Sequence, residues 1–304
     1  NVFGCAHTGQ GDDFINVHGT SVRILDVIDS VSVKVPVFNK GNGRNVEPGD
    51  EFWFIKASDA QRGSVRRVIS KEYVDAGDDS YFLVAFDAQL PDGIAAGDFL
   101  ENKTWIPDLH IRGCKILKRH RARGILATTP GKVVIEDNYF RTAGSAILLE
   151  GDFDFWYESG ANMDITIRNN VFDNCLTSGA KENTRGQWGY AVINISPSFV
   201  PKDTHTEPYH RNIVVTGNQF RMFDAPIVNA ASVGNFRFCN NEIIRTDDYE
   251  PYTWQKSAMR FEGCRDVVIE SNSIDPAFET RDIELRYMQP WHVSSQEEFV
   301  CRYE

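Results

Sequence analysis

The sequence lacks an excess of basic residues, because 32 Lys and Arg stand against 43 Asp and Glu and give a formal net charge of −11. Nucleic acids and anionic membrane surfaces attract proteins through clusters of positive charge. We therefore expect neither nucleic acid nor membrane binding. A neutral or polar substrate agrees better with this composition.

Closely paired cysteines and long apolar runs are also missing. The six cysteines show no C-x-x-C spacing, which argues against a zinc site and a small disulfide scaffold, and we predict buried free thiols. No apolar run approaches transmembrane length, and the first residues carry neither the basic nor the apolar segment of a signal peptide. We expect any signal peptide to have been removed or to lie outside this chain.

What the sequence does contain is an internal repeat. A short phrase alternates apolar and polar residues and then turns at an Asn or a small residue before another apolar position. It recurs as LHIRGCKI (109–116), VVIEDNYF (133–140), ITIRNNVF (165–172), IVVTGNQF (213–220), FRFCNNEI (236–243) and VVIESNSI (267–274). Each copy predicts one strand and one turn.

The spacing of the turn residues predicts the architecture. Successive turn asparagines are separated by 32, 48, 23 and 31 positions, and the shortest interval is about one coil of a β-solenoid. We predict an all-β chain that forms a right-handed parallel β-helix. Asn suits such bends because its side chain bonds the backbone locally, and stacked Asn side chains can form a ladder between coils. The predicted ladder contains Asn138, Asn170, Asn218, Asn241 and Asn272.

The opening stretch GQGDDFINVHG (9–19) aligns with the strand that follows each bend, so it predicts a first coil of the same helix. In this alignment Asp13 faces outward, beside a hollow left by the small residues Gly124, Ala146 and Ala191. One inward stack is predicted to contain Phe14, Ile125, Ile147, Val192, Ile227 and Met259.

Residues 22–104 do not carry the repeat. Alternating strands at 31–35, 51–55 and 81–86, separated by Gly, Asp and Pro turns, predict a small antiparallel β-barrel inserted beside the acidic coil. A second Gly-Asp-Asp at 77–79 lies between strands and predicts only a solvated turn. We thus expect a coil with the Asp pair at 1–21, the barrel at 22–104 and the rest of the β-helix at 105–304.

The Asp pair is the strongest candidate for chemistry. Glycoside hydrolysis needs two carboxyl groups, one to protonate the leaving oxygen and one to attack or to activate water. A neighbouring negative charge helps one acid stay protonated. Asp12 and Asp13 are therefore predicted catalytic residues. Together with His18 they match no strong metal-ligand spacing, and no metal site is expected.

Other polar and aromatic residues near this coil are candidate substrate contacts, although each has an ordinary structural explanation as well. The run at 150–160 packs aromatics around acids, which predicts either a sugar-binding loop or a loop anchored by its rings. The predicted contacts are Asn16, His18, Arg123, Glu150, Trp188, Tyr190 and Asn194.

Four phrases in this order, GDDFINVHG, RGILATTPGKVVIEDNYF, GSAILLEGDFDFWYESG and ITIRNNVFDNC, resemble the α-1,3-galactosidases of glycoside hydrolase family 110. The resemblance implies a β-helix with inserted barrels, in an inverting exo-enzyme that removes terminal α-1,3-linked galactose from glycans, including the blood-group B determinant, without a cofactor. It implies Asp12 as general acid, Asp13 as part of the base, and Glu158 as a substrate contact.

One feature departs from that family. The family is similar to other β-helix hydrolases in taking a further catalytic aspartate from the coil before the adjacent pair, and this chain starts too late to contain it. We therefore expect the chain to be catalytically incomplete and weak or inactive in isolation. The expected location is secreted, periplasmic or on the bacterial cell surface.

Two other functions stay open at the level of the sequence, because a β-helix does not fix an activity. One is a polygalacturonase-like hydrolase or a polysaccharide lyase, which would require a basic cleft. The other is a carbohydrate-binding solenoid without catalysis.

Overall fold

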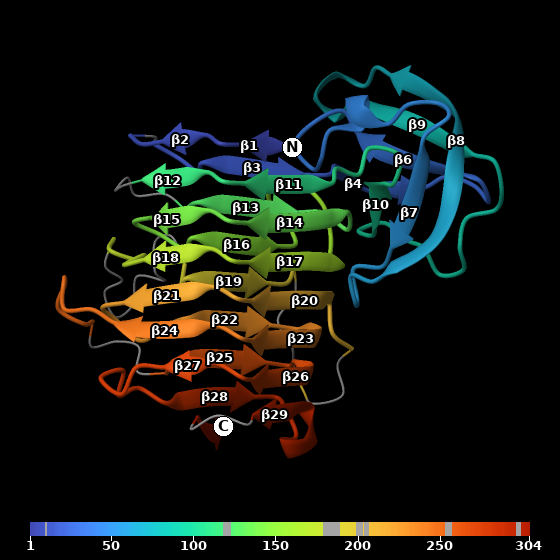
Figure 1. Cartoon of the computed structure of the whole chain (residues 1–304). Coiled ribbons are helices and arrows are strands. Elements are labelled where there is room, and N and C mark those ends of the chain that lie inside the picture. The colour runs from blue at the N-terminus through green and yellow to red at the C-terminus, as the bar shows by residue number, and fades with distance from the viewer. Residues whose placement is uncertain are drawn as a thin grey trace.

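The computed structural model of the chain describes residues 1–9, 11–117, 123–178, 189–198, 203, 207–252, 257–295 and 299–304. These residues form strands β1 to β30 and three short 3-10 helices, η1 (Gly43–Asn45), η2 (Gly77–Asp79) and η3 (Pro290–His292). Three stacked parallel sheets form a β-helix, and a curved antiparallel sheet lies beside its N-terminal coils (Figure 1).

Each of the first seven coils of the β-helix contributes one strand to each parallel sheet, and the last coil contributes β29 and β30 to the first and third sheets. The polar turns between strands let the apolar side chains meet inside. The first sheet contains β1 (Val2–Phe3), β11 (Leu109–Arg112), β14 (Lys132–Glu136), β17 (Asp164–Arg168), β20 (His210–Thr216), β23 (Val233–Cys239), β26 (Arg265–Glu270) and β29 (Val293–Ser295). The second contains β2 (Ala6–His7), β12 (Lys115–Leu117), β15 (Tyr139–Arg141), β18 (Val171–Asp173), β21 (Gln219–Met222), β24 (Glu242–Arg245) and β27 (Ser273–Ile274). The third contains β3 (Ile15–His18), β13 (Ile125–Thr128), β16 (Ile147–Glu150), β19 (Ile193–Ser196), β22 (Val228–Ala231), β25 (Met259–Glu262), β28 (Asp282–Arg286) and β30 (Val300–Tyr303).

The predicted asparagine ladder is confirmed. Asn170 Oδ1 accepts hydrogen bonds from both the backbone N–H and the side-chain amide of Asn138, each at 3.0 Å, and Asn170 bonds Asn218 in the same way. The left-handed bend itself belongs to the residue before each ladder position, such as Asp137 with φ 56° and Asn169 with φ 54°. Each turn thus depends on two adjacent residues: the first bends the backbone, and the second forms the hydrogen bonds between coils.

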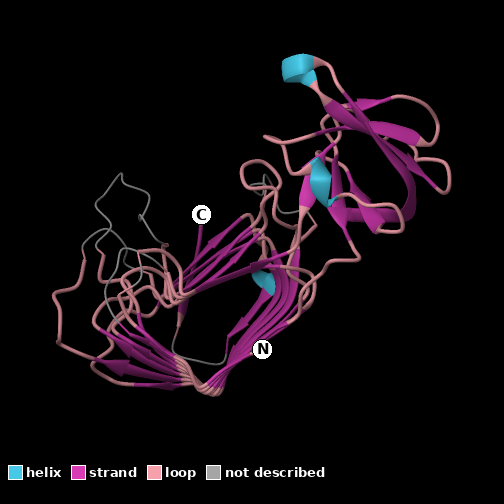
Figure 2. Ribbon diagram, turned by 90° about the horizontal axis from the view of Figure 1, so that it is seen from above, coloured by secondary structure: helices cyan, strands magenta, loops and turns pink. Residues whose placement is uncertain are grey.

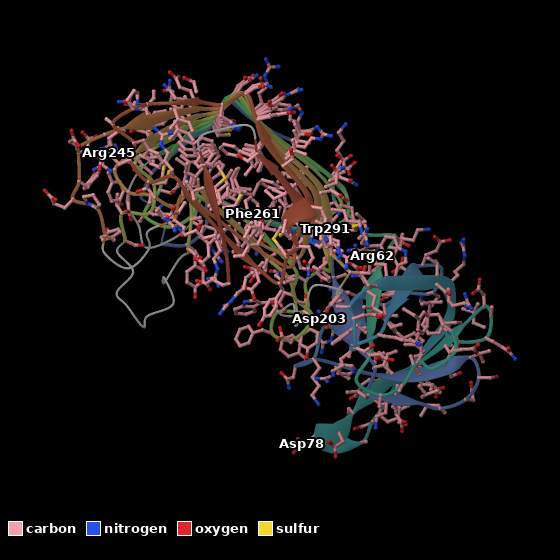
Figure 3. All side chains as sticks on the ribbon, turned by 90° about the horizontal axis from the view of Figure 1, so that it is seen from below. Arg62, Asp78, Asp203, Arg245, Phe261 and Trp291 are labelled. Carbon is pink, nitrogen blue, oxygen red and sulfur yellow. The ribbon has the colours of Figure 1, made fainter. Side chains whose placement is uncertain are left out.

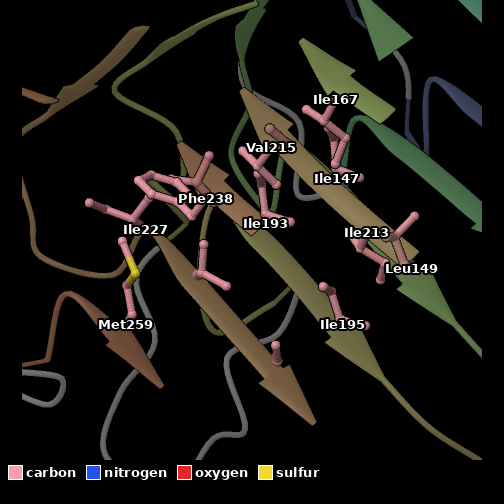
Figure 4. Close-up of a cluster of buried hydrophobic side chains, with 14 of the residues drawn as sticks. Ile147, Leu149, Ile167, Ile193, Ile195, Ile213, Val215, Ile227, Phe238 and Met259 are labelled. Carbon is pink, nitrogen blue, oxygen red and sulfur yellow. The ribbon is translucent and has the colours of Figure 1, made fainter. Parts of the chain in front are cut away.

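The interior of the β-helix is filled by aligned apolar columns (Figure 4). The register differs by one position from the predicted inward stack at Phe14, Val192 and Ile227. The observed column in the third sheet is Ile15, Ile125, Ile147, Ile193, Val228, Met259 and Ile283. Val192 and Ile227 are nonetheless fully buried in the same core and Phe14 packs against it, so the predicted residues lie inward but one position before the paired column.

The inserted segment forms the fourth sheet, in the order β4 (Ser21–Arg23), β10 (Phe99–Asn102), β7 (Glu51–Ile55), β8 (Arg62–Val74), β9 (Tyr81–Phe86), β6 (Ser32–Pro36) and β5 (Asp26–Val27). Its edge strands β4 and β5 are separated in the chain only by Ile24 and Leu25, so the sheet curls until its edges approach each other, as in a small barrel. Figure 2 shows this sheet beside the β-helix. The second Gly-Asp-Asp is the exposed helix η2 between β8 and β9, which confirms the predicted turn.

The cysteine prediction is correct for three of the six residues. Cys114, Cys175 and Cys264 are buried free thiols, whereas Cys5 is exposed and Cys239 and Cys301 are partly buried. Burial raises the pKa of the Cys264 thiol to about 12, so it is packed as an uncharged side chain.

Candidate active site

The Asp pair lies in the turn that enters β3. The backbone N–H of Phe14 donates to the carbonyl of Gly124 at 2.9 Å, which fixes this turn against the next coil. The backbone N–H of Asp13 donates to Asp12 Oδ1 at 3.0 Å. Asp12 stays exposed, whereas the Asp13 side chain is 8% exposed. The two adjacent carboxylates therefore occupy different environments.

Arg123 binds Asp13 through two side-chain hydrogen bonds. Its Nε donates to Asp13 Oδ1 and its Nη2 to Asp13 Oδ2, both at 2.8 Å, and its backbone N–H lies 3.3 Å from Oδ1. This contact corrects the predicted hollow of small residues, because the register places Arg123 rather than Gly124 beside Asp13. A bidentate guanidinium fixes the orientation of a carboxylate as well as neutralising its charge.

Glu158 connects to the first coil through two residues of β3. The side-chain amide of Asn16 donates to Glu158 Oε1 at 3.0 Å, and His18 Nε2 lies 3.9 Å from the same oxygen. His18 Nδ1 lies 2.6 Å from the carbonyl of Gly19, which can only accept, so Nδ1 carries a proton. Two predicted contacts on β3 thus meet a third that is distant in sequence.

Glu150 ends strand β16 and enters the same region. The pKa of its carboxyl is raised to about 7, mainly by burial; the charge of Arg123 opposes this rise, and the charges of Asp152, Glu158 and Asp13 contribute to it. At neutral pH a substantial fraction of Glu150 is therefore protonated. A protonated carboxyl group can donate a hydrogen bond to a sugar oxygen, which a carboxylate cannot do.

The loop at 151–160 forms the outer wall. Asp152 Oδ1 accepts the backbone N–H groups of Phe155, Trp156 and Tyr157 at 3.0, 2.9 and 3.3 Å. Asp152 is itself buried, and Tyr157 has φ 57°, so the chain turns sharply before Glu158. This one carboxylate therefore holds the first half of the loop.

The inserted sheet holds the same loop from the other side. Glu101 of β10 is fully buried and receives two bonds from Arg62 of β8, at 2.6 and 2.8 Å. It also accepts the hydroxyl of Ser159 and the N–H of Gly160, while Arg62 donates to the carbonyl of Ala161 at 2.8 Å. Figure 3 labels Arg62 where the inserted sheet meets the β-helix. The insertion therefore positions the loop that carries Glu158.

These groups enclose a pocket of about 660 Å³. It is lined by Asp12, Asp13, Asn16, Arg123, Leu126, Glu150, Asp152, Asp154, Phe155, Trp156 and Glu158. Two aromatic rings and six carboxyl groups face one space, in which Arg123 is the one basic residue among the described lining residues. Acids beside exposed rings suit a neutral polyhydroxylated ligand, because the rings contact its carbon-bound hydrogens and the acids accept its hydroxyls.

Four of the predicted contacts do not line this pocket or cannot be placed. His18 lies beside Glu158, 3.9 Å from its Oε1, and is not among the lining residues. Asn194 on β19 is buried, donates to Ser196 Oγ at 3.1 Å and accepts from Asn229 at 2.9 Å, so its amide bonds the outer face of the β-helix. Tyr190 is half-buried and does not line the pocket. Trp188 lies outside the described residues.

Sequence reasoning missed Asp152, Asp154, Phe155 and Trp156 as individual site residues, although the acidic and aromatic run that contains them was visible. No cluster of three His, Cys, Asp or Glu side chains that could hold a metal ion is found among the described residues. Within the same part of the chain, no helix is long and apolar enough to cross a membrane.

The fold and the site thus define a parallel β-helix protein with an acidic pocket beside an inserted antiparallel sheet. No family model matches the chain. It is 37% identical over 289 residues to the protein named alpha-1,3-galactosidase B of Bacteroides thetaiotaomicron, covering 94% of this chain and 45% of that protein. It is 35% identical to alpha-1,3-galactosidase B of Akkermansia muciniphila, covering 88% of this chain and 33% of that protein.

A third relative, alpha-1,3-galactosidase A of Bacteroides fragilis, is 35% identical over 94% of this chain and 46% of its own length. The chain spans about half the length, or less, of these curated relatives. Over the part that it spans, the chain is a homologue of the proteins named alpha-1,3-galactosidase.

Proposed function

We propose that the chain forms the Asp-pair pocket of an inverting exo-α-1,3-galactosidase, which removes terminal α-linked galactose from glycans. The observation that carries the proposal is the shared pocket of Asp12, Asp13, Glu150 and Glu158 in a chain homologous to proteins of that name. Inverting hydrolysis needs one carboxylic acid at the leaving oxygen and one carboxylate for water. The pocket supplies candidates for both.

The different surroundings of the two aspartates support a division of roles. Asp12 is exposed toward the pocket and is proposed as the general acid. Asp13 is held by Arg123 and is proposed as part of the base, because a fixed carboxylate can orient a water molecule for attack. Glu150 and Glu158, together with Asn16 and His18, are proposed contacts to substrate hydroxyls.

The pocket charge favours a neutral galactoside over a polyuronate. A polygalacturonase or a lyase must attract uronate carboxylates, whereas six acids line this pocket and Arg123 is committed to Asp13. We also propose that glycans with the blood-group B determinant are among the substrates. Such glycans lie outside the cytoplasm, which supports the proposed secreted, periplasmic or cell-surface location.

The test is NMR of Galα1-3Gal incubated with this chain and with a form extended upstream, because the pair is expected to need a further aspartate. The form that is active should release β-galactose as the first anomer. Asp13→Asn should lower kcat by about 10³-fold, as expected for the loss of a general base. Asp79→Asn, in the exposed second Gly-Asp-Asp, is the matched control and should keep full activity.

Other outcomes would contradict the proposal in distinct ways. α-Galactose as the first product would contradict inversion, and full activity of Asp13→Asn would contradict the assigned base. Galactoside binding without hydrolysis by either form would favour the carbohydrate-binding solenoid. Cleavage of polygalacturonate instead would favour the polyuronate enzyme.

A further inference from the structure

Two large rings at the edge of the pocket are exposed to solvent. Phe155 is 71% exposed and Trp156 is 72% exposed, and both line the pocket that contains the Asp pair. The rings meet edge to face with centroids 4.7 Å apart and planes at 84°. Adjacent exposed aromatics in a pocket are a costly arrangement in water unless a ligand covers them.

The loop that carries these rings is rigidly built. Asp152 accepts three successive backbone N–H groups, as described above, and the two neighbouring rings of the loop point away from solvent. Phe153 is buried and stacks on Phe99 of β10 at 5.1 Å, and Tyr157 is also buried. Two buried rings thus flank the two exposed rings and anchor them. Binding to preformed rings avoids the entropy cost of ordering them.

A second anchor comes from the inserted sheet. Glu101 accepts hydrogen bonds from Ser159 and Gly160, and the N–H of Ser21 donates to the carbonyl of Tyr157 at 2.9 Å. The loop is therefore fixed at both ends of its aromatic segment. Its rings cannot fold into the core without breaking the bonds to buried Asp152 and Glu101.

The chemistry of hexoses indicates which ligand suits this surface. In galactose the axial 4-hydroxyl leaves the hydrogens on carbons 3, 4 and 5 together on one face, which makes that face apolar. In glucose the equatorial 4-hydroxyl interrupts this patch. An aromatic ring beside hydroxyl-binding acids can therefore stack on galactose more favourably than on glucose.

We propose that Trp156, supported edge-on by Phe155, is a stacking platform for the apolar face of the terminal galactose, and that it selects galactose over glucose. This inference rests on the proposed function, since it places the sugar between the rings and the Asp pair. The platform is a binding element and takes no part in proton transfer.

The experiment measures binding of methyl α-galactoside and methyl α-glucoside to the full chain by saturation-transfer NMR and calorimetry. Trp156→Ala should weaken galactoside binding roughly tenfold or more, and Trp156→Phe should weaken it less because it keeps a ring. Trp291→Ala is the matched control, since Trp291 is 76% exposed on η3, which directly precedes β29 at the opposite end of the first sheet from β1, and should leave binding unchanged. Thermal unfolding of each variant checks that the fold is intact.

Kinetics separate this proposal from the proposed function. Where Galα1-3Gal is hydrolysed, Trp156→Ala should raise KM by a similar factor and leave kcat nearly unchanged. Hydrolysis with an unchanged KM, or equal affinity for both methyl glycosides, would overturn the platform and leave the galactosidase standing. Trp156-dependent galactoside binding without hydrolysis by either this chain or the form extended upstream would support the platform and count against the enzyme. Neither binding nor hydrolysis would overturn both.

Discussion

The β-helix and the inserted sheet obtain their neighbours in different ways. In the β-helix each residue lies beside its equivalent in the next coil, so Asn138 bonds Asn170 and Phe140 stacks on Phe172 at 5.1 Å. In the inserted sheet the long strand β8 pairs with β7 along its first half and β9 along its second, and unlike residues meet. The sequence repeat therefore determines the contacts in the β-helix, and the curvature of the antiparallel sheet determines them in the insertion.

The pocket combines these two kinds of construction. The β-helix supplies Asp13 and Arg123 from adjacent coils, while the inserted sheet supplies Glu101 to hold the loop with Glu158. A solenoid repeats one environment along its axis, so it needs an irregular element to close a pocket on one side. The insertion provides that element at the first coil.

The largest effect should follow from separating the two regions at Glu101. Glu101→Gln leaves Arg62 with an uncompensated buried charge and should lower the free energy of unfolding by about 4 kcal/mol. Glu47→Gln, in the loop between η1 and β7, removes an ion pair with Lys71 of β8 in which the carboxylate is half exposed, and should cost at most about 1 kcal/mol. Chemical denaturation measures both variants.

The same variant tests the link to the loop. The N–H of Gly160 donates to Glu101, so its hydrogen exchange should accelerate in Glu101→Gln and stay slow in Glu47→Gln. Unchanged protection of Gly160 would show that the loop does not depend on the inserted sheet.

A smaller effect should follow from interrupting the ladder of the β-helix. Asn170→Ala removes bonds to both neighbouring coils and to the carbonyl of Ile135, and should cost about 3 kcal/mol because buried partners are left unpaired. Gln219→Ala is the control, since its amide bonds only Glu242 at the exposed surface, and should change stability by about 0.5 kcal/mol or less. Equal losses in the two variants would contradict the ladder's role.

The smallest effect concerns pH and the pocket. Glu150 has its pKa raised to about 7 in the folded chain, so the folded state binds its proton more tightly than the unfolded state, where the ordinary value is 4.5. Its contribution to stability is full below about pH 4.5 and is lost as the pH rises through about 7. The free energy of unfolding of the parent should fall by about 2 kcal/mol over this window when it is compared with that of Glu150→Gln. This is less than the full pKa shift implies, because the side chain is partly exposed.

Denaturation of both proteins at pH 4, 6 and 8 measures this difference. Glu72→Gln, at an exposed position, controls for the loss of one negative charge. A difference between parent and Glu150→Gln that stays constant across the three pH values would show that the Glu150 environment does not favour its neutral form.

Much of the β-helix could be predicted because its information is local. The Asn turns, the strand phrases and the exposed turn at 77–79 each follow from a few adjacent residues. At Phe14, Val192 and Ile227 the predicted stack lies one position before the paired column, because each of these residues is followed by a second apolar residue that also packs in the core. The same offset hid the contact between Asp13 and Arg123.

The candidate site was predicted as a set of residues but not as an arrangement. Asp12, Asp13, Asn16, Arg123, Glu150 and Glu158 were named from the sequence, and the structure brings them into one pocket. Asn194 was predicted as a contact because it lies near the inferred stack of coils beside the Asp pair, yet its amide bonds Asn229 and Ser196. The sequence pattern indicates which face of a strand a residue occupies. Whether the residue reaches the pocket depends on the coil to which its strand belongs.

The sequence by itself determined the repeat, the turn chemistry, the position of the insertion and the acidic character of the first coil, because each depends on residues close together in the chain. Only the tertiary structure decided that Arg123 holds Asp13, that Glu101 fixes the loop with Glu158, and that Phe155 and Trp156 face the pocket. These contacts join residues far apart in sequence. They depend on coil register and on how the inserted sheet packs, and a pattern of neighbouring residues does not encode either.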